Sequence, residues 1–177
     1  MPLILKFFKI YMKDQSIATI IFSDNREKVL LIKRRDVPVW VLPGGGIEEC
    51  EKLKDAAIRE TFEETGYRVE IIKKVGEYFP INKLTKHTHL YECKILSGKA
   101  SIGDETKDIN FFNIKKLPKY LPEPYVLWIK DAYKKHPYLI KKKLDLITYR
   151  LLFKYFLKYP HLVFRFLLTR IGIYINS

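Results

Sequence analysis

Residues 45–67 read GGIEECEKLKDAAIRETFEETGY, and charged side chains recur in this stretch at the spacing of an α-helix. Residues three and four positions apart share one face of a helix, so Glu60, Glu63 and Glu64 are expected to point the same way. Arg59 stands beside them, and a guanidinium can hold a carboxylate through two parallel hydrogen bonds. Clustered carboxylates repel each other unless a cation lies among them, and oxygen ligands favour Mg²⁺ or Mn²⁺ over Zn²⁺. The stretch therefore predicts a divalent-metal site.

The same residues fit the pattern G-x5-E-x7-R-E-U-x-E-E-x-G-U, in which U is a bulky apolar residue. The fixed letters fall on Gly45, Glu51, Arg59, Glu60, Glu63, Glu64 and Gly66, and the U positions fall on Thr61 and Tyr67. The stretch thus resembles the Nudix box. A solvated helix with ordinary Glu–Lys pairs would explain Glu51 beside Lys54, but it would not explain glycines at both ends.

The resemblance implies hydrolysis of a diphosphate linkage in a nucleoside diphosphate joined to another group. In family members the box glutamates hold the metal ions, which implies Mg²⁺ or Mn²⁺ ligands at Glu60, Glu63 and Glu64. The resemblance also implies a backbone carbonyl ligand in the glycine turn, at Gly45 or its neighbour Gly44. Glu51 would support this shell, and Arg59 would orient a glutamate.

The general base is not determined by the box, because family members take it from the box or from a later loop. The loop candidate here is Glu105, which precedes the strand expected at residues 109–112. A solvated turn carboxylate is the alternative interpretation of Glu105. The candidate catalytic residues are therefore Arg59, Glu63, Glu64 and Glu105.

Three residues outside the box are candidates for substrate binding: Arg35, Trp40 and His89. His87, His89 and Tyr91 alternate along an expected strand, so they project from one face and would line a base or sugar pocket. Core packing is the alternative for these side chains and for Trp40. The specific nucleotide is not indicated by these residues.

The remainder of the first part of the chain reads mainly as strands. Runs at 16–22 and 28–35 flank a turn and predict a hairpin. Further strands are expected at 68–79, 87–95 and 109–112. These strands, the box helix and a later helix predict an α+β fold with a mixed sheet between helices. The resemblance implies the same α/β/α sandwich.

The box helix is expected over residues 51–65. Its core face would carry Leu53, Ala57 and Thr61. Gly66 suits the left-handed position that ends many helices.

The charge of the chain is unevenly distributed. The 177 residues carry a net charge of +13, and 47% of them are hydrophobic, which is typical of a folded protein. Residues 127–177 hold 11 Lys and Arg against 2 Asp and Glu, so +9 of the total lies there. With prolines near residue 122, this shift predicts a catalytic domain at 1–125 and a helical extension at 126–177. Residues 1–13 fit either a strand or a helix.

The features of the amino-terminal residues and the cysteines favour the cytoplasm. Lys6, Lys9 and Lys13 interrupt the apolar residues at the amino terminus, which argues against a secretory signal. Cys50 and Cys93 form no C-x-x-C pair and no disulfide framework. The expected location of the protein is the cytoplasm, either free or at the inner face of a membrane.

Residues 138–159 predict a basic amphipathic helix. Lys143, Arg150, Lys154 and Lys158 form a stripe beside Leu, Ile and Phe, and Pro160 interrupts the helix before residues 161–175. No uncharged run reaches the roughly 20 residues that span a bilayer. An anionic membrane surface and protein packing, including a homodimer, are both open as partners of residues 138–175. Nucleic acid is not expected, since the cations lie among apolar residues.

Two classes of function remain. The leading one is a Mg²⁺-dependent hydrolase, and the alternative is a catalytically silent binding or regulatory protein that works through its basic tail. The glutamate cluster favours the hydrolase, because a binding module does not need mutually repelling carboxylates.

Overall fold

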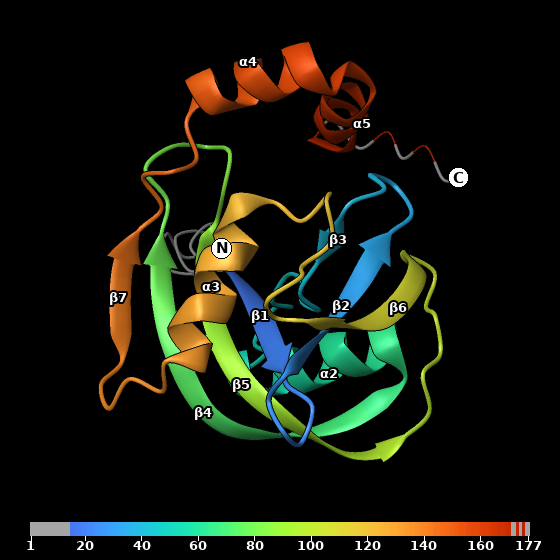
Figure 1. Ribbon diagram of the computed structural model, residues 1–177, viewed down its shortest axis with the longest axis vertical. Helices are drawn as coiled ribbons and strands as arrows, with labels where there is room; N and C mark the ends of the chain where they lie inside the picture. Colours follow the sequence, from blue (N-terminus) through green and yellow to red (C-terminus); the bar gives the residue numbers. More distant parts are fainter. Residues whose placement is uncertain (1–14, 171–172, 174, 176–177) are drawn as a thin grey trace, which may run out of the picture.

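Two β-sheets form the centre of the molecule, with α3 in front of them and α2 behind (Figure 1). The computed structural model describes residues 15–170, 173 and 175. The larger sheet has the order β1 (Gln15–Ile21), β5 (His87–Gly98), β4 (Tyr67–Phe79) and β7 (Ile140–Lys143), and the smaller has the order β3 (Trp40–Val41), β2 (Lys28–Arg34) and β6 (Thr106–Asn113). The larger sheet is mixed, because β1 runs parallel to β5 and β7 parallel to β4, whereas β4 and β5 are antiparallel.

Each face of the sheets is covered by a helix. Helix α2 (Leu53–Thr65) buries Ala56 and Ala57 against Ile17 of β1. Helix α3 (Glu123–Tyr133) lies on the other face, where Trp128 and Ile129 join the cluster that contains Ile20 and Leu31. Successive strand residues point to opposite faces, so β1 contributes to both clusters. The predicted α+β fold, an α/β/α sandwich with a mixed sheet, is confirmed.

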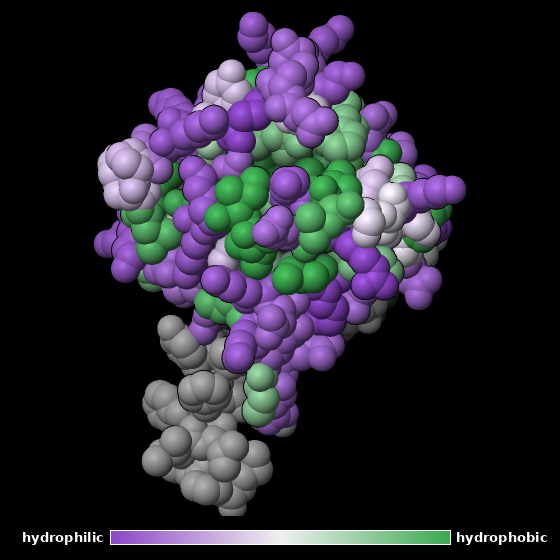
Figure 2. Space-filling view, turned by 90° about the horizontal axis from the view of Figure 1, so that it is seen from below, coloured by the Kyte–Doolittle hydropathy of each residue, from purple (hydrophilic) through white to green (hydrophobic). Residues whose placement is uncertain are grey.

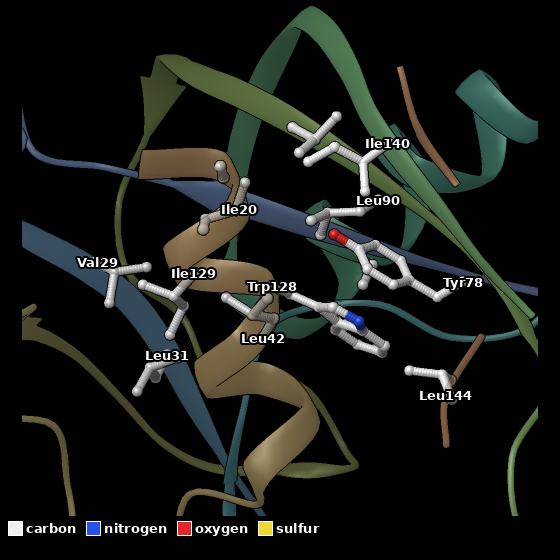
Figure 3. Close-up of a cluster of buried hydrophobic side chains, with 13 residues drawn as sticks. Ile20, Val29, Leu31, Leu42, Tyr78, Leu90, Trp128, Ile129, Ile140 and Leu144 are labelled. Atoms are coloured by element: carbon white, nitrogen blue, oxygen red, sulfur yellow. The ribbon is translucent and has the colours of Figure 1, made fainter. Parts of the chain in front are cut away.

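The cluster beneath α3 draws on residues that are far apart in the chain (Figure 3). The Tyr78 and Trp128 rings lie 5.3 Å apart, and Ile140 and Leu144 are buried in the same cluster. The predicted boundary between residues 125 and 126 falls inside α3. Residues of α3 and β7 pack in the same cluster as the strands that precede this boundary. Helices α4 (Tyr149–Lys158) and α5 (Pro160–Arg170) lie outside this sandwich, above the end of β2 in Figure 1.

The predicted hairpin of the first two strands is wrong. β1 pairs with β5, and β2 pairs with β3 and β6, so the two strands belong to different sheets. The other edge of β1 is occupied by the glycine turn, because Ile17 N donates to Gly45 O at 3.0 Å. An isolated bridge between Phe22 and Val29 links the chain at the turn.

The predicted helix over 138–159 is wrong in its first half. Residues Ile140–Lys143 form β7, which pairs with the edge of β4 and buries Ile140 while its lysines stay exposed. Helix α4 begins at Tyr149, after Thr148 accepts a hydrogen bond from Leu151 N at 3.1 Å. Lys143 therefore does not belong to the helical stripe, whereas the predicted break at Pro160 is confirmed.

The surface mixes polar and apolar side chains. On the face seen from below in Figure 1, a group of hydrophobic residues is surrounded by hydrophilic ones (Figure 2). In the part of the chain that the structure describes, no helix is long and apolar enough to cross a membrane. Residues 1–13, which fitted either a strand or a helix, lie outside the described residues.

Candidate active site

Helix α2 is closed by a left-handed glycine, as the sequence predicts. Gly66 has φ of 73° and donates from its backbone N–H to Phe62 O at 2.7 Å. Thr61 takes an apolar position of the box, and its hydroxyl is satisfied by Ala57 O at 2.7 Å and by Thr19 at 2.8 Å. Of the predicted core face, Ala57 and Thr61 are buried and Leu53 is partly buried. These contacts set the rotation of the helix and so the direction of its glutamates.

Arg59 joins three glutamates of the box. Its Nε and Nη2 donate to the two carboxylate oxygens of Glu51, each at 2.8 Å. Its Nη1 donates to Glu60 Oε1 and to Glu63 Oε2, each at 3.0 Å. A fifth contact runs from Nη2 to Gly46 O at 3.3 Å. The guanidinium therefore ties the loop before the helix to the carboxylates on it.

The glycine turn lies directly against these carboxylates. A Cβ atom at Gly45 would come within 2.5 Å of the Glu60 carboxyl group. The same turn runs along the edge of β1, where Thr19 N donates to Pro43 O at 2.8 Å. The sheet therefore positions the Gly45 carbonyl, which has a second lone pair besides the one that accepts from Ile17.

Glu64 is the buried member of the cluster. Its side chain accepts from Gly44 N at 2.8 Å, and the residue is 7% exposed. Burial raises the pKa of Glu64 to about 8, and the negative charge of Glu60 adds to this increase. Burial likewise raises the pKa of Glu60. A cation placed between the two would reverse both shifts, because it favours the charged carboxylates.

The loop of Glu105 packs on the end of α2. A Cβ atom at Gly103 would come within 2.2 Å of Glu63 O, and Ser101 N donates to Thr65 O at 2.9 Å. Glu105 itself is exposed, and its charge contributes to the raised pKa of Glu60 and of Glu64. The structure therefore brings Glu105 into the electrostatic range of the box.

Arg34 belongs to this site and was missed in the sequence. Its Nε and Nη2 bind the Asp36 carboxylate at 2.8 and 2.5 Å, and its charge opposes the rise in the pKa of Glu64. Alternation along β2 is a signal that points to it, since Arg34 lies two residues from Ile32 and four from Leu30, which faces α2. The predicted Arg35 meets the site through its backbone, donating to Glu105 O at 2.9 Å.

Trp40 and His89 lie in different places. The Trp40 ring packs edge-on against Phe112 at 4.6 Å and is partly buried in the core beneath α3. His89 accompanies His87 and Tyr91 in a cavity of about 910 Å³ at the start of α2, which also reaches Glu51. His89 Nε2 lies 2.7 Å from Gln15 Oε1, and burial lowers the pKa of His89 to about 4.

The oxygen-only donor set at the box fits a hard divalent ion such as Mg²⁺ or Mn²⁺. Among the described residues, no three acidic, histidine or cysteine side chains already stand in the geometry of a metal site. Glu60 and Glu63 face Arg59, and Glu64 faces Gly44 N. Both cysteines are free, as expected, with Cys50 exposed and Cys93 buried.

Known proteins are similar to this chain in sequence and in fold. A family profile for the NUDIX domain matches residues 12–135. A Bacillus subtilis (strain 168) protein named "Putative 8-oxo-dGTP diphosphatase" is 36% identical over 105 residues, which are 59% of this chain and 70% of that protein. An "ADP-ribose pyrophosphatase" of Methanocaldococcus jannaschii is 33% identical over 122 residues, covering 65% of this chain and 71% of the relative.

Solved structures show the same arrangement of elements. The crystal structure of an ADP-ribose pyrophosphatase from Streptococcus suis 89-1591 superposes with a TM-score of 0.60 at 21% identity, over 74% of this chain and 98% of that one. A likeness at this identity concerns the fold alone. The chain belongs to the NUDIX family, and it is a pyrophosphohydrolase of the Nudix type.

Proposed function

We propose that the protein hydrolyses the diphosphate linkage of a nucleoside diphosphate derivative, with Mg²⁺ or Mn²⁺ as cofactor. Nucleoside triphosphates and ADP-ribose-like compounds are the substrate classes named for its relatives. The observation that carries the proposal is the set of contacts from Arg59 to Glu51, Glu60 and Glu63, beside the buried Glu64.

The box residues would hold the metal. Glu60, Glu63 and Glu64 would supply carboxylate oxygens, and Gly45 would supply its backbone carbonyl. When bound, the divalent ions neutralise charge that develops on the diphosphate and lower the pKa of a coordinated water. Arg59 orients the glutamates, as outer partners of metal ligands do.

Glu105 is the proposed acceptor of the proton from the attacking water, with the box as the alternative source of the base. Its loop is packed on the end of α2 through Gly103 and Ser101, and its charge acts on Glu60 and Glu64. The exposed carboxylate can pass the proton on to solvent. A base must lie within hydrogen-bond reach of the water, directly or through a second water.

The substrate would extend from this cluster in two directions. Arg34 supplies a positive charge next to Glu64 and is oriented by Asp36, so it suits a phosphate oxygen. His89, neutral at physiological pH, lines the cavity that reaches Glu51 and would contact the base or sugar. Arg35 and Trp40 remain proposals for substrate contact.

Residues 138–175 lead to a proposal for the location of the protein and for its partners. We place the protein in the cytoplasm, with residues 138–175 contacting an anionic membrane surface or a second copy of the chain. A purely regulatory role is disfavoured by the glutamate cluster, because a binding module does not need mutually repelling carboxylates, one of which is buried.

A panel of nucleotide substrates assayed with Mg²⁺ and with Mn²⁺, with products identified by mass, tests the proposal. Glu60→Gln and Glu64→Gln each remove a charge at nearly constant shape and should lower kcat by roughly 10² or more. Glu70→Gln, an exposed position on β4, is the matched control. Full turnover in both box variants, or turnover in excess EDTA, would refute the assignment.

A further inference from the structure

Helix α4 has an apolar face that the protein does not cover. None of its residues is buried, and Phe153 and Leu157 are 62% and 69% exposed. Leu151 and Tyr155 are only partly exposed and lie on the side turned toward the rest of the chain. At about 100° per residue, Tyr149, Phe153, Phe156 and Leu157 fall within an arc of roughly 100°. Phe164 and Leu167 of α5 are exposed as well.

A stripe of cations borders this apolar face. Arg150, Lys154 and Lys158 occupy the next arc of about 80° on α4. All three are exposed. An apolar face flanked by cations is typical of helices that lie in the interface of an anionic bilayer. A second copy of the chain is a less favourable partner for this face, because a two-fold interface would bring these cations together. Residues 127–177 contain only 2 Asp and Glu that could pair with them.

The same helix pair is joined to the active site. Arg165 of α5 donates from Nε to Asp36 O at 2.6 Å and from Nη2 to Arg35 O at 3.1 Å. The Asp36 carboxylate binds Arg34, whose charge acts on Glu64. Tyr159 between the helices packs edge-on against Tyr120 at 5.6 Å. Helix α5 therefore contacts the backbone of the loop at residues 35 and 36, directly after Arg34.

We infer that α4 and α5 seat the protein on an anionic bilayer, and that its substrate is a nucleoside diphosphate esterified to a lipid held in that bilayer. This inference rests on the proposed diphosphate hydrolysis and names the group at the far end of the substrate. A helix lying in the interface puts the loop of Arg34 at the level of the headgroups, where the diphosphate of such a lipid lies. A water-soluble nucleotide would gain nothing from this placement.

The reaction follows the proposed chemistry. The oxygen of water forms a bond to one phosphorus, and the bond from that phosphorus to the bridging oxygen breaks. The bridging oxygen leaves with the other phosphate, and the proton of the water passes through the base to solvent. The products are a nucleoside monophosphate and a lipid phosphate that stays in the bilayer.

Matched substrates test the inference. The full-length protein is assayed on nucleoside 5′-diphosphate diacylglycerols of all four bases, in vesicles of equimolar phosphatidylcholine and phosphatidylglycerol. The corresponding water-soluble nucleoside 5′-diphosphate glycerols carry the same diphosphate without acyl chains.

We expect kcat/KM to be at least about ten-fold higher on one lipid-linked substrate than on its soluble counterpart. This ratio should decrease in high salt, which screens the attraction between the cations and the bilayer. Equal or better hydrolysis of the soluble member overturns the inference alone, as does no hydrolysis of either member by a protein that hydrolyses a compound of the nucleotide panel. No hydrolysis of these compounds or of any compound of the panel overturns the proposed function as well.

Tail variants separate the surface from the chemistry. Phe153→Ser with Leu157→Ser should reduce co-sedimentation with these vesicles about ten-fold or more, because two apolar side chains no longer enter the interface. Hydrolysis of the lipid-linked substrate should fall in parallel, and that of the soluble member should not change. Ile72→Ser on β4, at a residue 56% exposed, is the control. Unchanged sedimentation, or conversion of a dimer to monomers by the tail variant, contradicts the membrane assignment.

Discussion

The guanidinium of Arg59 meets both carboxylate oxygens of Glu51 at 2.8 Å, from Nε and from Nη2. Glu51 also accepts from Glu48 N at 2.9 Å, so this pair holds the loop that leads from the glycine turn to α2. The remaining nitrogen of Arg59 faces Glu60 and Glu63. One side chain therefore fixes the distance between the loop and the proposed metal ligands.

Arg59→Lys should lower activity without unfolding the domain. A lysine keeps the charge but cannot make the two parallel bonds to Glu51. We expect metal affinity or kcat to fall about 10- to 100-fold, the usual cost of losing an outer partner of a metal ligand. Metal titration and steady-state kinetics measure this, with Arg68→Lys on the surface of β4 as the control. Kinetics equal to the parent protein would mean that Arg59 only stabilises the loop.

Gly45→Ala should displace Glu60. The new Cβ would come within 2.5 Å of a carboxyl group at the end of a flexible side chain, which can move aside at little cost in stability. We expect kcat to fall about ten-fold or more while the melting temperature is nearly unchanged. Gly46→Ala is a close control, because a Cβ there meets nothing within 4 Å. Equal loss in both variants would point to the backbone of the turn as the cause.

Glu105→Gln tests the source of the base. The amide cannot accept a proton, so kcat should fall about 10²-fold or more, while metal affinity and stability are retained. Asp104→Asn, at the preceding exposed residue of the loop, should have little effect. If the kinetics of Glu105→Gln are unchanged, the base belongs to the box.

His89 should make the domain less stable in acid. Burial lowers its pKa from 6.5 to about 4, so the unfolded chain binds this proton more readily than the folded one. Stability is therefore fully present above pH 6.5 and decreases as the pH falls toward 4, by at most about 3 kcal/mol for this group. Urea unfolding of the parent and of His89→Gln across this range measures the difference. Parallel pH profiles would rule out His89 as the cause.

Two truncations should behave differently. A chain that ends at residue 148 keeps β7 and the buried Leu144, so we expect hydrolysis of a soluble substrate to be retained. A chain that ends at residue 137 loses Ile140 and Leu144 from the core, at a cost of about 3–6 kcal/mol. Thermal unfolding and turnover of both chains test this. Equal melting temperatures would show that β7 contributes no stability.

Features of the fold that depend on residues a few positions apart could be predicted from the sequence. The helical spacing of Glu60, Glu63 and Glu64, and the glycine that ends α2, depend on residues a few positions apart, and both are present in the structure. Sheet pairing depends on contacts between distant segments. The parallel pairing of β1 with β5 joins residues 72 positions apart, such as Gln15 and His87, and a turn between β1 and β2 gives no sign of it.

The prediction of one helix over residues 138–159 was wrong in its first half because the helical pattern was judged over the whole segment. Lysines and apolar residues at 140–144 fit a helical stripe, but the free edge of β4 and the core pocket that takes Leu144 outweigh that local preference. In the site, the contact of the Arg34 charge with Glu64 depends on the packing of β2 beside α2, which the local sequence does not show. Contacts such as Arg165 with Asp36 connect residues 129 positions apart and leave no local signal.

The close packing of residues 101–105 on the end of α2 couples the contacts in this part of the domain. The Ser101 amide is bound to Thr65 O, the Gly66 amide to Phe62 O, and Gly103 lies against Glu63. No one of these contacts can open without loosening the others, so this part of the domain behaves as a single unit in local unfolding. Glu105 and the box glutamates are therefore expected to keep their relative positions together or lose them together, and the two amides should show the same protection factor in hydrogen exchange.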